Sequence, residues 1–307
     1  MSDPSGLRLP DFIGIGPTRT GSTWLHHALG GVTELPGVKE TRFFGERYYK
    51  GIDWYTRHFQ NSLDRAPIGE ICPTYFPSIE AIERIHSYIP DCKIICTFRD
   101  PVHRAYSHYK LMRRLAATRD TFEDALAADD GNWESNRYEF YLRKWRARFG
   151  AERVLVTLFD DLICDPQAYL DRICRFVGAK RVALAERKFP PRARNEIKRQ
   201  PTNRSLALVA QMLRSWLEDH EAKLVLKFLR DSRGFRYFFE HGEPFPPLDS
   251  EVEARLRGRF RPEVEALEEL IGRDLSSWKQ NGDSTADRDR RRSDSPKMSQ
   301  TTHPESL

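Results

Sequence analysis

Long apolar runs are absent from this sequence of 307 residues: no stretch of about 18 consecutive residues is apolar enough for a membrane-spanning helix. The first residues, Met-Ser-Asp-Pro-Ser-Gly, carry neither a basic region nor an apolar stretch, so we expect no secretory signal. Hydrophobic residues still make up 39% of the chain, which suffices for the core of one large domain or two small ones. We therefore expect a globular protein without a membrane span.

Cysteine is also scarce, and its pattern excludes common metal sites. The number of cysteines is odd, and no two of them have zinc-ribbon spacing. Histidine, cysteine and acidic residues nowhere cluster with the spacing of metal ligands. The sequence therefore predicts free and mostly buried thiols, a cytoplasmic location and no metal. The five cysteines are Cys72, Cys92, Cys96, Cys164 and Cys174.

A strong excess of one charge is lacking as well. The 50 basic and 45 acidic residues give a net charge of +5, which suits anionic ligands but is too diffuse to indicate nucleic acid. The most basic segment, residues 188–204, is interpreted as a solvated cationic stretch, and a surface that grips polyanions is the alternative. Residues 281–307 contain no aromatic residue, which predicts a disordered tail. We expect a flexible leader over 1–9 and one domain over 10–280.

The stretch of residues 12–25 has the pattern of a strand, a glycine-rich turn and a helix. An apolar run stops at Gly16, and after Gly21 apolar residues recur with helical spacing. Such a turn presents backbone N–H groups to a phosphate, and Arg19 adds a permanent positive charge. The glycine spacing fits an ATPase P-loop, but Ser22 stands where the P-loop lysine belongs. The stretch predicts a phosphate cradle that does not hold a triphosphate, with an ordinary strand–helix turn as the alternative.

Strands and helices alternate along the rest of the chain, which predicts an α/β fold with a parallel, doubly wound sheet. Residues 94–98 form a continuous apolar run that is typical of a central parallel strand. Asp100 and Pro101 are suited to cap and begin the next helix. Further strands are expected within 67–77 and over 154–159, and further helices over 78–89, 134–149, 166–177, 205–230 and 250–272, with a helix or loop over 119–131.

Arg99 follows the predicted central strand, and Ser107 lies two turns into the helix after it. Ligands of open α/β sheets bind at the carboxyl ends of the strands. An arginine and a serine placed there can hold a phosphate by charge-assisted hydrogen bonds. The alternative is that Arg99 only caps or pairs with Asp100.

Lys39 and Glu40 precede two aromatic residues, Phe43 and Phe44. A carboxylate beside an apolar wall can act as a general base for a hydroxyl or an amine, although a solvated Lys-Glu pair is the commoner arrangement. The aromatic residues within 43–59 are equally consistent with core packing and with the wall of a pocket.

Together these stretches resemble the sulfotransferases that use 3′-phosphoadenosine 5′-phosphosulfate (PAPS), in particular the bacterial and carbohydrate (heparan-type) branch. Gly16 to Leu25 resembles that family's 5′-phosphosulfate loop, and Lys93 to Tyr109 its 3′-phosphate motif. Lys39 to Phe44 resembles the Lys-Glu-Pro-His-Phe-Phe segment of heparan-type members. Gly69-Glu70, with Pro73 and Tyr75, resembles the family's Gly-Glu-Lys-x-Pro-x-Tyr turn. The resemblance covers roughly residues 10–279 and implies the P-loop-like sulfotransferase fold.

The resemblance also implies roles for individual residues. Glu40 takes the place of the proposed catalytic base, with Arg19 and Lys39 beside the reacting group. Arg99 and Ser107 would hold the 3′-phosphate. The loop contacts to the cofactor would come from Arg19, Thr20, Gly21, Ser22, Thr23 and Trp24.

The sequence departs from the family pattern at several positions. Thr18 stands where a proline usually precedes the basic residue of the loop, and Thr41-Arg42 replaces the Pro-His of the heparan-type segment. Ile71 replaces the lysine of the Gly-Glu-Lys turn, so that one cation near the sulfuryl group is missing unless Lys39 serves instead. The Gly-rich C-terminal cofactor loop is not recognisable, and we place its replacement in 192–204.

The function that the resemblance implies is transfer of the sulfuryl group of PAPS, without a metal, to a hydroxyl or amine of a small-molecule or carbohydrate acceptor, which leaves the desulfated nucleotide PAP. Two alternatives remain: a P-loop kinase or nucleotide triphosphatase, against which Ser22 argues, and a non-catalytic polyanion-binding module. Should Glu40 not be the base, the candidates are His26, His27, His58, His103 and His108. The sequence identifies neither the acceptor nor the oligomeric state.

Overall fold

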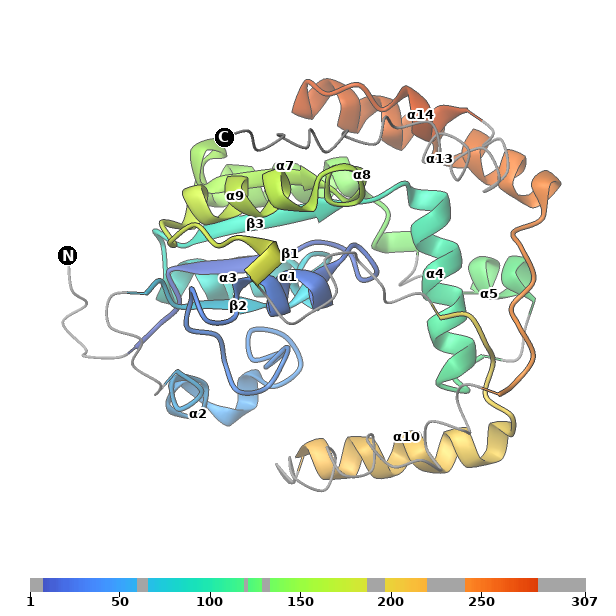
Figure 1. Cartoon of the computed structure of the whole chain (residues 1–307), viewed down its shortest axis with the longest axis horizontal. Coiled ribbons are helices and arrows are strands. Elements are labelled where there is room, and N and C mark those ends of the chain that lie inside the picture. Colours follow the sequence, from blue (N-terminus) through green and yellow to red (C-terminus); the bar gives the residue numbers. More distant parts are fainter. Residues whose placement is uncertain are drawn as a thin grey trace, which may run out of the picture.

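The computed structural model describes residues 8–59, 66–118, 121–128, 133–186, 197–219 and 241–280. Its centre is a parallel sheet of four strands in the order β2-β1-β3-β4 (Figure 1). The strands are β1 (Phe12–Ile15), β2 (Gly69–Ile71), β3 (Lys93–Phe98) and β4 (Val154–Leu158). The α/β fold with a parallel sheet is confirmed.

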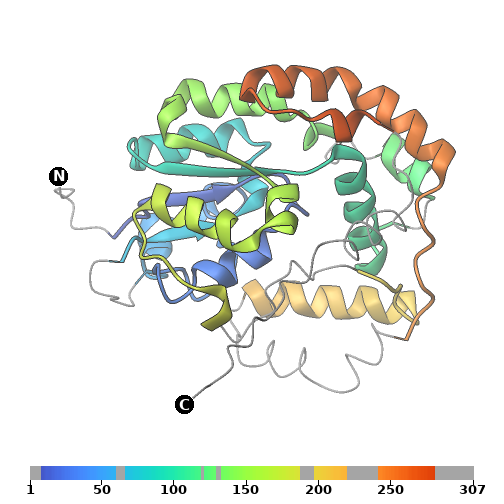
Figure 2. The same cartoon turned by 45° about the horizontal axis from the view of Figure 1, so that its top comes forward.

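Helices cover both faces of this sheet, as a doubly wound topology requires. Side chains alternate along β1, so that Ile13 packs with α3, α7 and α13 while Phe12 packs with α1 and α9 (Figure 2). The helices are α1 (Ser22–Leu29), α2 (Ile52–Thr56), α3 (Ile79–Tyr88), α4 (Pro101–Arg114), α5 (Phe122–Ala128), α7 (Tyr138–Phe149), α8 (Phe159–Cys164), α9 (Pro166–Val177), α10 (Arg204–Asp219), α13 (Ser250–Ile271) and α14 (Ser276–Lys279).

Most element boundaries lie within a few residues of the predicted ones, and two differences are informative. The predicted strand over 154–159 ends one residue earlier, because Phe159 begins α8. The predicted helix over 134–149 begins only at Tyr138. Residues 1–7 and 281–307 lie outside the described residues, so the leader, the tail and the domain limits stay predictions. Among the described helices, none combines the length and apolar character needed to cross a bilayer.

Asp100 connects α4 to the long helix α13. Its Oδ1 accepts hydrogen bonds from the N–H groups of Val102 and His103, which makes it the predicted N-cap. Its Oδ2 accepts from Arg257 Nη1 of α13 at 3.1 Å, and both side chains are almost fully buried. Asp100 therefore caps α4 and pairs with Arg257.

Candidate active site

The glycine-rich turn connects β1 to α1 and passes close to β3. Gly16 has a φ of 127°, and a Cβ atom at this position would lie 2.7 Å from the carbonyl oxygen of Thr97. Gly21 has a φ of 98° and is the N-cap of α1. Both positions combine a backbone conformation that favours glycine with little room for a side chain. The turn is thereby pressed against the carboxyl ends of β1 and β3.

The N-terminus of α1, like that of α7, has no side-chain cap. Serine or aspartate side chains cap α3, α4, α9 and α13, whereas Gly21 offers no side chain to the first N–H groups of α1. A helix N-terminus carries a partial positive charge and N–H groups without intrahelical partners. This end of α1 is therefore suited to an anion, as predicted from the turn.

Arg19 and Ser107, 88 residues apart, meet beside this turn. Arg19 Nε donates a hydrogen bond to Ser107 Oγ of α4 at 2.9 Å. Arg99 Nη1 donates to the carbonyl oxygen of Arg19 at 3.2 Å, and the hydroxyl of Thr18 lies 3.3 Å from His108 Nδ1. The structure thus joins the glycine-rich turn to the Arg99–Ser107 stretch in one site.

Positive charge is concentrated at this junction. Burial, followed by the nearby charges of Arg99 and Arg114, lowers the pKa of Arg19 to about 10. The guanidinium of Arg99 lies over the ring of Phe159, 4.6 Å from its centroid. The three arginines repel one another where little water screens their charges. An anion bound among them would offset this repulsion and would be strongly stabilised. Clustered groups with perturbed pKa values are typical of functional sites.

Lys39 connects Glu40 to the first turn of α1. Its ammonium donates to Thr23 Oγ1 at 2.8 Å and lies 2.7 Å from Glu40 Oε1. The Glu40 side chain is only 17% exposed. Ile71, which replaces the family's lysine, is 2% exposed and belongs to the core cluster under α1. Lys39 thus brings a cation to the loop from a different segment of the chain.

The structure also places the other predicted residues of the loop. The Trp24 side chain is 6% exposed and packs edge-on against Tyr169 in the core, so it does not line the site. Thr20 is buried and its hydroxyl donates to the carbonyl oxygen of Pro17 within the turn. Ser22 begins α1. Cofactor contacts by side chains at these positions remain predictions, and Trp24 can offer only its backbone there.

The aromatic segment divides between core and surface. Phe43, Phe44, Tyr55 and Phe59 are fully buried. Phe43 stacks on Tyr55, and the rings of Phe44 and Phe59 make edge-to-face contacts with this pair. Tyr49, in contrast, is 78% exposed. These buried rings form core, not a pocket wall. The carboxylate of Glu70 lies buried among them. The sequence analysis named Glu70 as part of the Gly-Glu turn but assigned it no role.

The basic segment is only partly described. Lys188, Arg192 and Arg194 lie outside the described residues. Around Arg199 the chain pairs with 243–245 through backbone hydrogen bonds, and Arg199 Nη1 donates to the carbonyl oxygen of Gly242. A cofactor contact by 192–204 stays a prediction.

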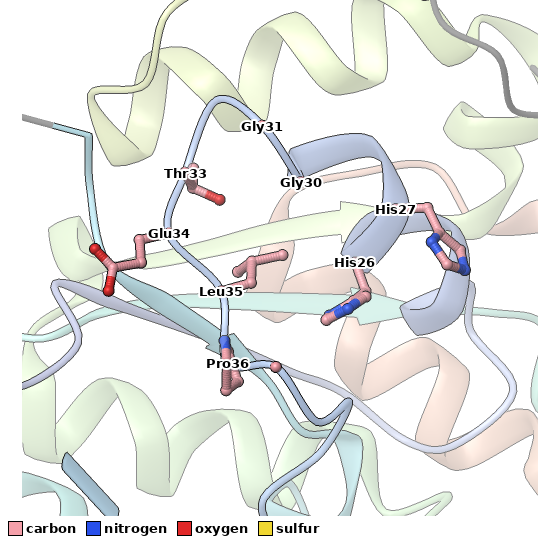
Figure 3. Close-up of a pocket in the computed structure, with 9 residues that line it drawn as sticks. His26, His27, Gly30, Gly31, Thr33, Glu34, Leu35 and Pro36 are labelled. Carbon is pink, nitrogen blue, oxygen red and sulfur yellow. The ribbon is translucent and has the colours of Figure 1, made fainter. Parts of the chain in front are cut away.

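A cavity of about 350 Å³ lies between α1 and residues 30–37. Figure 3 shows His26 facing Leu35 there, with the carboxylate of Glu34 pointing away from His26 and His27 on another side of α1. Burial, then the charges of His27 and Lys39, lower the pKa of His26 to about 4. The polar groups therefore do not converge, and His26 is a weak base at neutral pH.

The cysteines are free, and four are buried while Cys164 is exposed, which confirms the predicted thiols. Within the described ranges, no three histidine, cysteine or acidic side chains are grouped as metal ligands.

Comparison with known proteins gives consistent matches. Residues 65–182 match a family model described as the sulfotransferase family. The bifunctional heparan sulfate N-deacetylase/N-sulfotransferase 4 of Mus musculus is 29% identical over 88% of this chain and 31% of its own length. The heparan sulfate glucosamine 3-O-sulfotransferase 3A1 of Homo sapiens is 31% identical over 59% of this chain and 47% of its own length. The chain thus spans about a third to a half of these relatives.

The fold has a counterpart among solved structures. A crystal structure of a sulfotransferase from Alicyclobacillus acidocaldarius superposes with a TM-score of 0.64 at 21% identity, over 89% of this chain and all of that one. This likeness concerns the fold, while the sequence matches concern the family and include heparan-type enzymes. Over residues 65–182 the chain therefore matches the sulfotransferase family, and its fold resembles that of a solved sulfotransferase.

Proposed function

We propose that the protein transfers the sulfuryl group of PAPS to a hydroxyl or an amine of a carbohydrate or small-molecule acceptor. One observation carries the proposal: Arg19, the Lys39-Glu40 pair and the Arg99–Ser107 stretch converge on the uncapped N-terminus of α1. A cationic cradle with a half-buried carboxylate beside it combines the two elements that such a transfer needs.

The residues of the cradle fit an anionic nucleotide. Arg19 and the first N–H groups of α1 would hold its 5′ end, and Arg99 with Ser107 its 3′-phosphate. Ser107 accepts a hydrogen bond from Arg19, so its own hydroxyl hydrogen stays available for a phosphate oxygen. Bound there, PAPS supplies the activated sulfuryl group.

Glu40 is the general base in this proposal. It takes the proton of the acceptor while the acceptor oxygen or nitrogen bonds to sulfur; the bond from sulfur to the 5′-phosphate oxygen breaks, and PAP leaves with that electron pair. Lys39 and Arg19 stabilise the charge that develops on the departing oxygen, as preorganised donors do in other transfers. Lys39 would thereby replace the cation that is missing at Ile71.

A carbohydrate acceptor is favoured by the relatives, whose names describe enzymes of heparan sulfate. Those names include both an N-sulfotransferase and a 3-O-sulfotransferase, so they support a glycan acceptor without choosing between an amine and a hydroxyl group.

For the location we propose the cytoplasm, because the five free cysteines suit a reducing compartment.

Calorimetric titration with PAP tests the proposal against its two rivals. A sulfotransferase should bind PAP without Mg²⁺ and prefer it to ATP. A P-loop kinase should prefer ATP with Mg²⁺, and a polyanion-binding module should bind neither nucleotide. Radiolabelled PAPS incubated with an extract of the host, followed by mass analysis of the labelled product, would then identify the acceptor. Absence of PAP binding would refute the proposed function.

A further inference from the structure

Glu70 of β2 is a fully buried carboxylate that receives hydrogen bonds from three side chains and one backbone group. Its Oε1 accepts from the N–H of Thr41 at 2.7 Å and from Thr41 Oγ1 at 2.6 Å. Its Oε2 accepts from the hydroxyl of Tyr55 at 2.9 Å. Tyr75 OH lies 3.3–3.4 Å from both oxygens. All partners are donors, which suits an acceptor-only, ionised carboxylate.

The same network extends along the backbone that follows Glu40. The N–H of Phe43 donates to Thr41 Oγ1 and the N–H of Phe44 to Tyr75 OH, each at 3.2 Å. Thr41 itself is fully buried. Glu70 and its partners therefore hold the segment that begins one residue after Glu40.

This segment has an unusual backbone. Glu40 has a φ of 63° and Arg42 a φ of 57°, in the left-handed region that side-chain-bearing residues rarely adopt. Such residues persist where the surrounding structure over-determines them. Thr41 lies between the two and is the residue that Glu70 holds by both its backbone and its side chain.

We propose that Glu70 is a positioning residue for the reaction, which acts by holding Thr41 and thereby the conformation that directs Glu40 toward Lys39 and the first turn of α1. This inference rests on the proposed function of Glu40. Thr41 occupies the position where the family pattern has proline, and the two hydrogen bonds to Glu70 restrain this threonine by a different means.

Burying the Glu70 carboxylate has a free-energy cost, because a carboxylate away from water is unfavourable unless its hydrogen bonds are satisfied. Burial raises the pKa of Glu70, and the hydrogen bonds from Thr41, Tyr55 and Tyr75 oppose this rise. An apolar residue could pack against the surrounding rings without this cost. A role in orienting Thr41 would explain why this buried position carries a carboxylate.

The test compares Glu70→Gln with Glu40→Gln and with the double variant. The probe is radiolabelled PAPS with de-N-sulfated heparin, which offers both hydroxyls and amines. Loss of precise positioning should lower kcat by about 10- to 10²-fold in Glu70→Gln and leave the Kd of PAP unchanged. In the Glu40→Gln background the same change should alter kcat by less than about twofold, because groups that act as a unit are non-additive. Additive losses would overturn the proposal.

Glu34→Gln is the matched control, because Glu34 is 2% exposed and pairs with Arg8 outside this network. Its kcat should stay within about twofold of the unchanged protein. An equal loss of kcat in both variants, together with lowered thermal stability, would show a merely structural role for Glu70.

Hydrogen exchange separates this inference from the proposed function. In Glu70→Gln the amides of 41–44 should exchange faster while those of α1 do not, and unchanged exchange at 41–44 would overturn the inference whether or not the protein turns over PAPS.

Discussion

Replacing Lys39 by methionine tests the most distinctive feature of the site, a cation supplied by a different segment from the one that the family pattern uses. Methionine keeps much of the apolar length of lysine but removes the charge that contacts both Thr23 and Glu40. If Lys39 stabilises the departing oxygen, kcat should fall. The affinity for PAP should change less, because Arg19 and Arg99 remain.

The structure sets the expected size of this effect. The ammonium of Lys39 lies 2.7 Å from Glu40, and we take the same contact distance for the departing oxygen. Two unit charges at this distance attract by about 6 kcal/mol at an effective dielectric constant of ~20. Because a third of the Lys39 side chain is exposed, solvent screening reduces the net effect to the range of charge-assisted hydrogen bonds, roughly 1.5–3 kcal/mol. That corresponds to a fall in kcat of about 10- to 10²-fold.

Single-turnover measurements with radiolabelled PAPS and de-N-sulfated heparin would separate the chemical step from binding. Lys50→Met is a suitable control, since Lys50 lies over the ring of Trp54 and not at the site; its rate should stay within about twofold of the unchanged protein. Lys39→Arg should retain part of the rate. A normal rate in Lys39→Met would refute the role of Lys39 and leave Arg19 as the cation on which the proposed mechanism depends.

Three further predictions follow from the same geometry. Glu40→Gln should lower kcat by about 10²- to 10⁴-fold with an unchanged Kd for PAP; full activity would place the base elsewhere. Arg99→Met should weaken PAP binding, measured by calorimetry, by about 10- to 10²-fold, and equal affinity would exclude Arg99 from the phosphate site. Asp100→Asn should destabilise the fold by roughly 1–3 kcal/mol at neutral pH, because the buried Arg257 loses one of its two carboxylate partners and keeps only Glu253. Burial opposes ionisation of Asp100, but the hydrogen bond and charge of His103 and the charge of Arg257 hold its pKa at about 2, below the ordinary 3.8. The stability from this depressed pKa is present above about pH 4 and is lost as the pH falls toward 2, so denaturant unfolding should show the variant and the unchanged protein converging there; a constant difference down to pH 2 would contradict the assignment.

The elements around the site were predictable because they depend on local patterns. Gly16 and Gly21 mark a turn whose backbone only glycine adopts easily, and the apolar runs around them have strand and helix periodicity. The carboxyl ends of parallel strands share one edge of the sheet. The approach of Arg99 and Ser107 to Arg19 therefore follows from topology alone, without knowledge of any side-chain contact.

The contacts that position individual side chains were not predictable in this way. Arg257, 157 residues away, pairs with Asp100, and no periodic pattern connects two such positions. Trp24 follows the turn directly, but its place on the buried side of α1 directs the ring into the core. The hydrogen bonds from Thr41 to Glu70 join two segments that the sequence motifs mark separately, and neither motif predicts this contact. Tertiary packing decides each of these cases.

Backbone strain offers a separate line of argument for where function lies. Among the residues that the structure describes, four residues other than glycine have positive φ angles: Arg19, Glu40, Arg42 and Ala116. Each such residue costs of the order of 1–3 kcal/mol, and such strain persists where packing and hydrogen bonds enforce it, often at active sites. Three of the four belong to the loop or to the segment of the candidate base. Glycine would adopt these angles without strain, so the side chains of Arg19 and Glu40 are retained at positions where stability alone favours their removal.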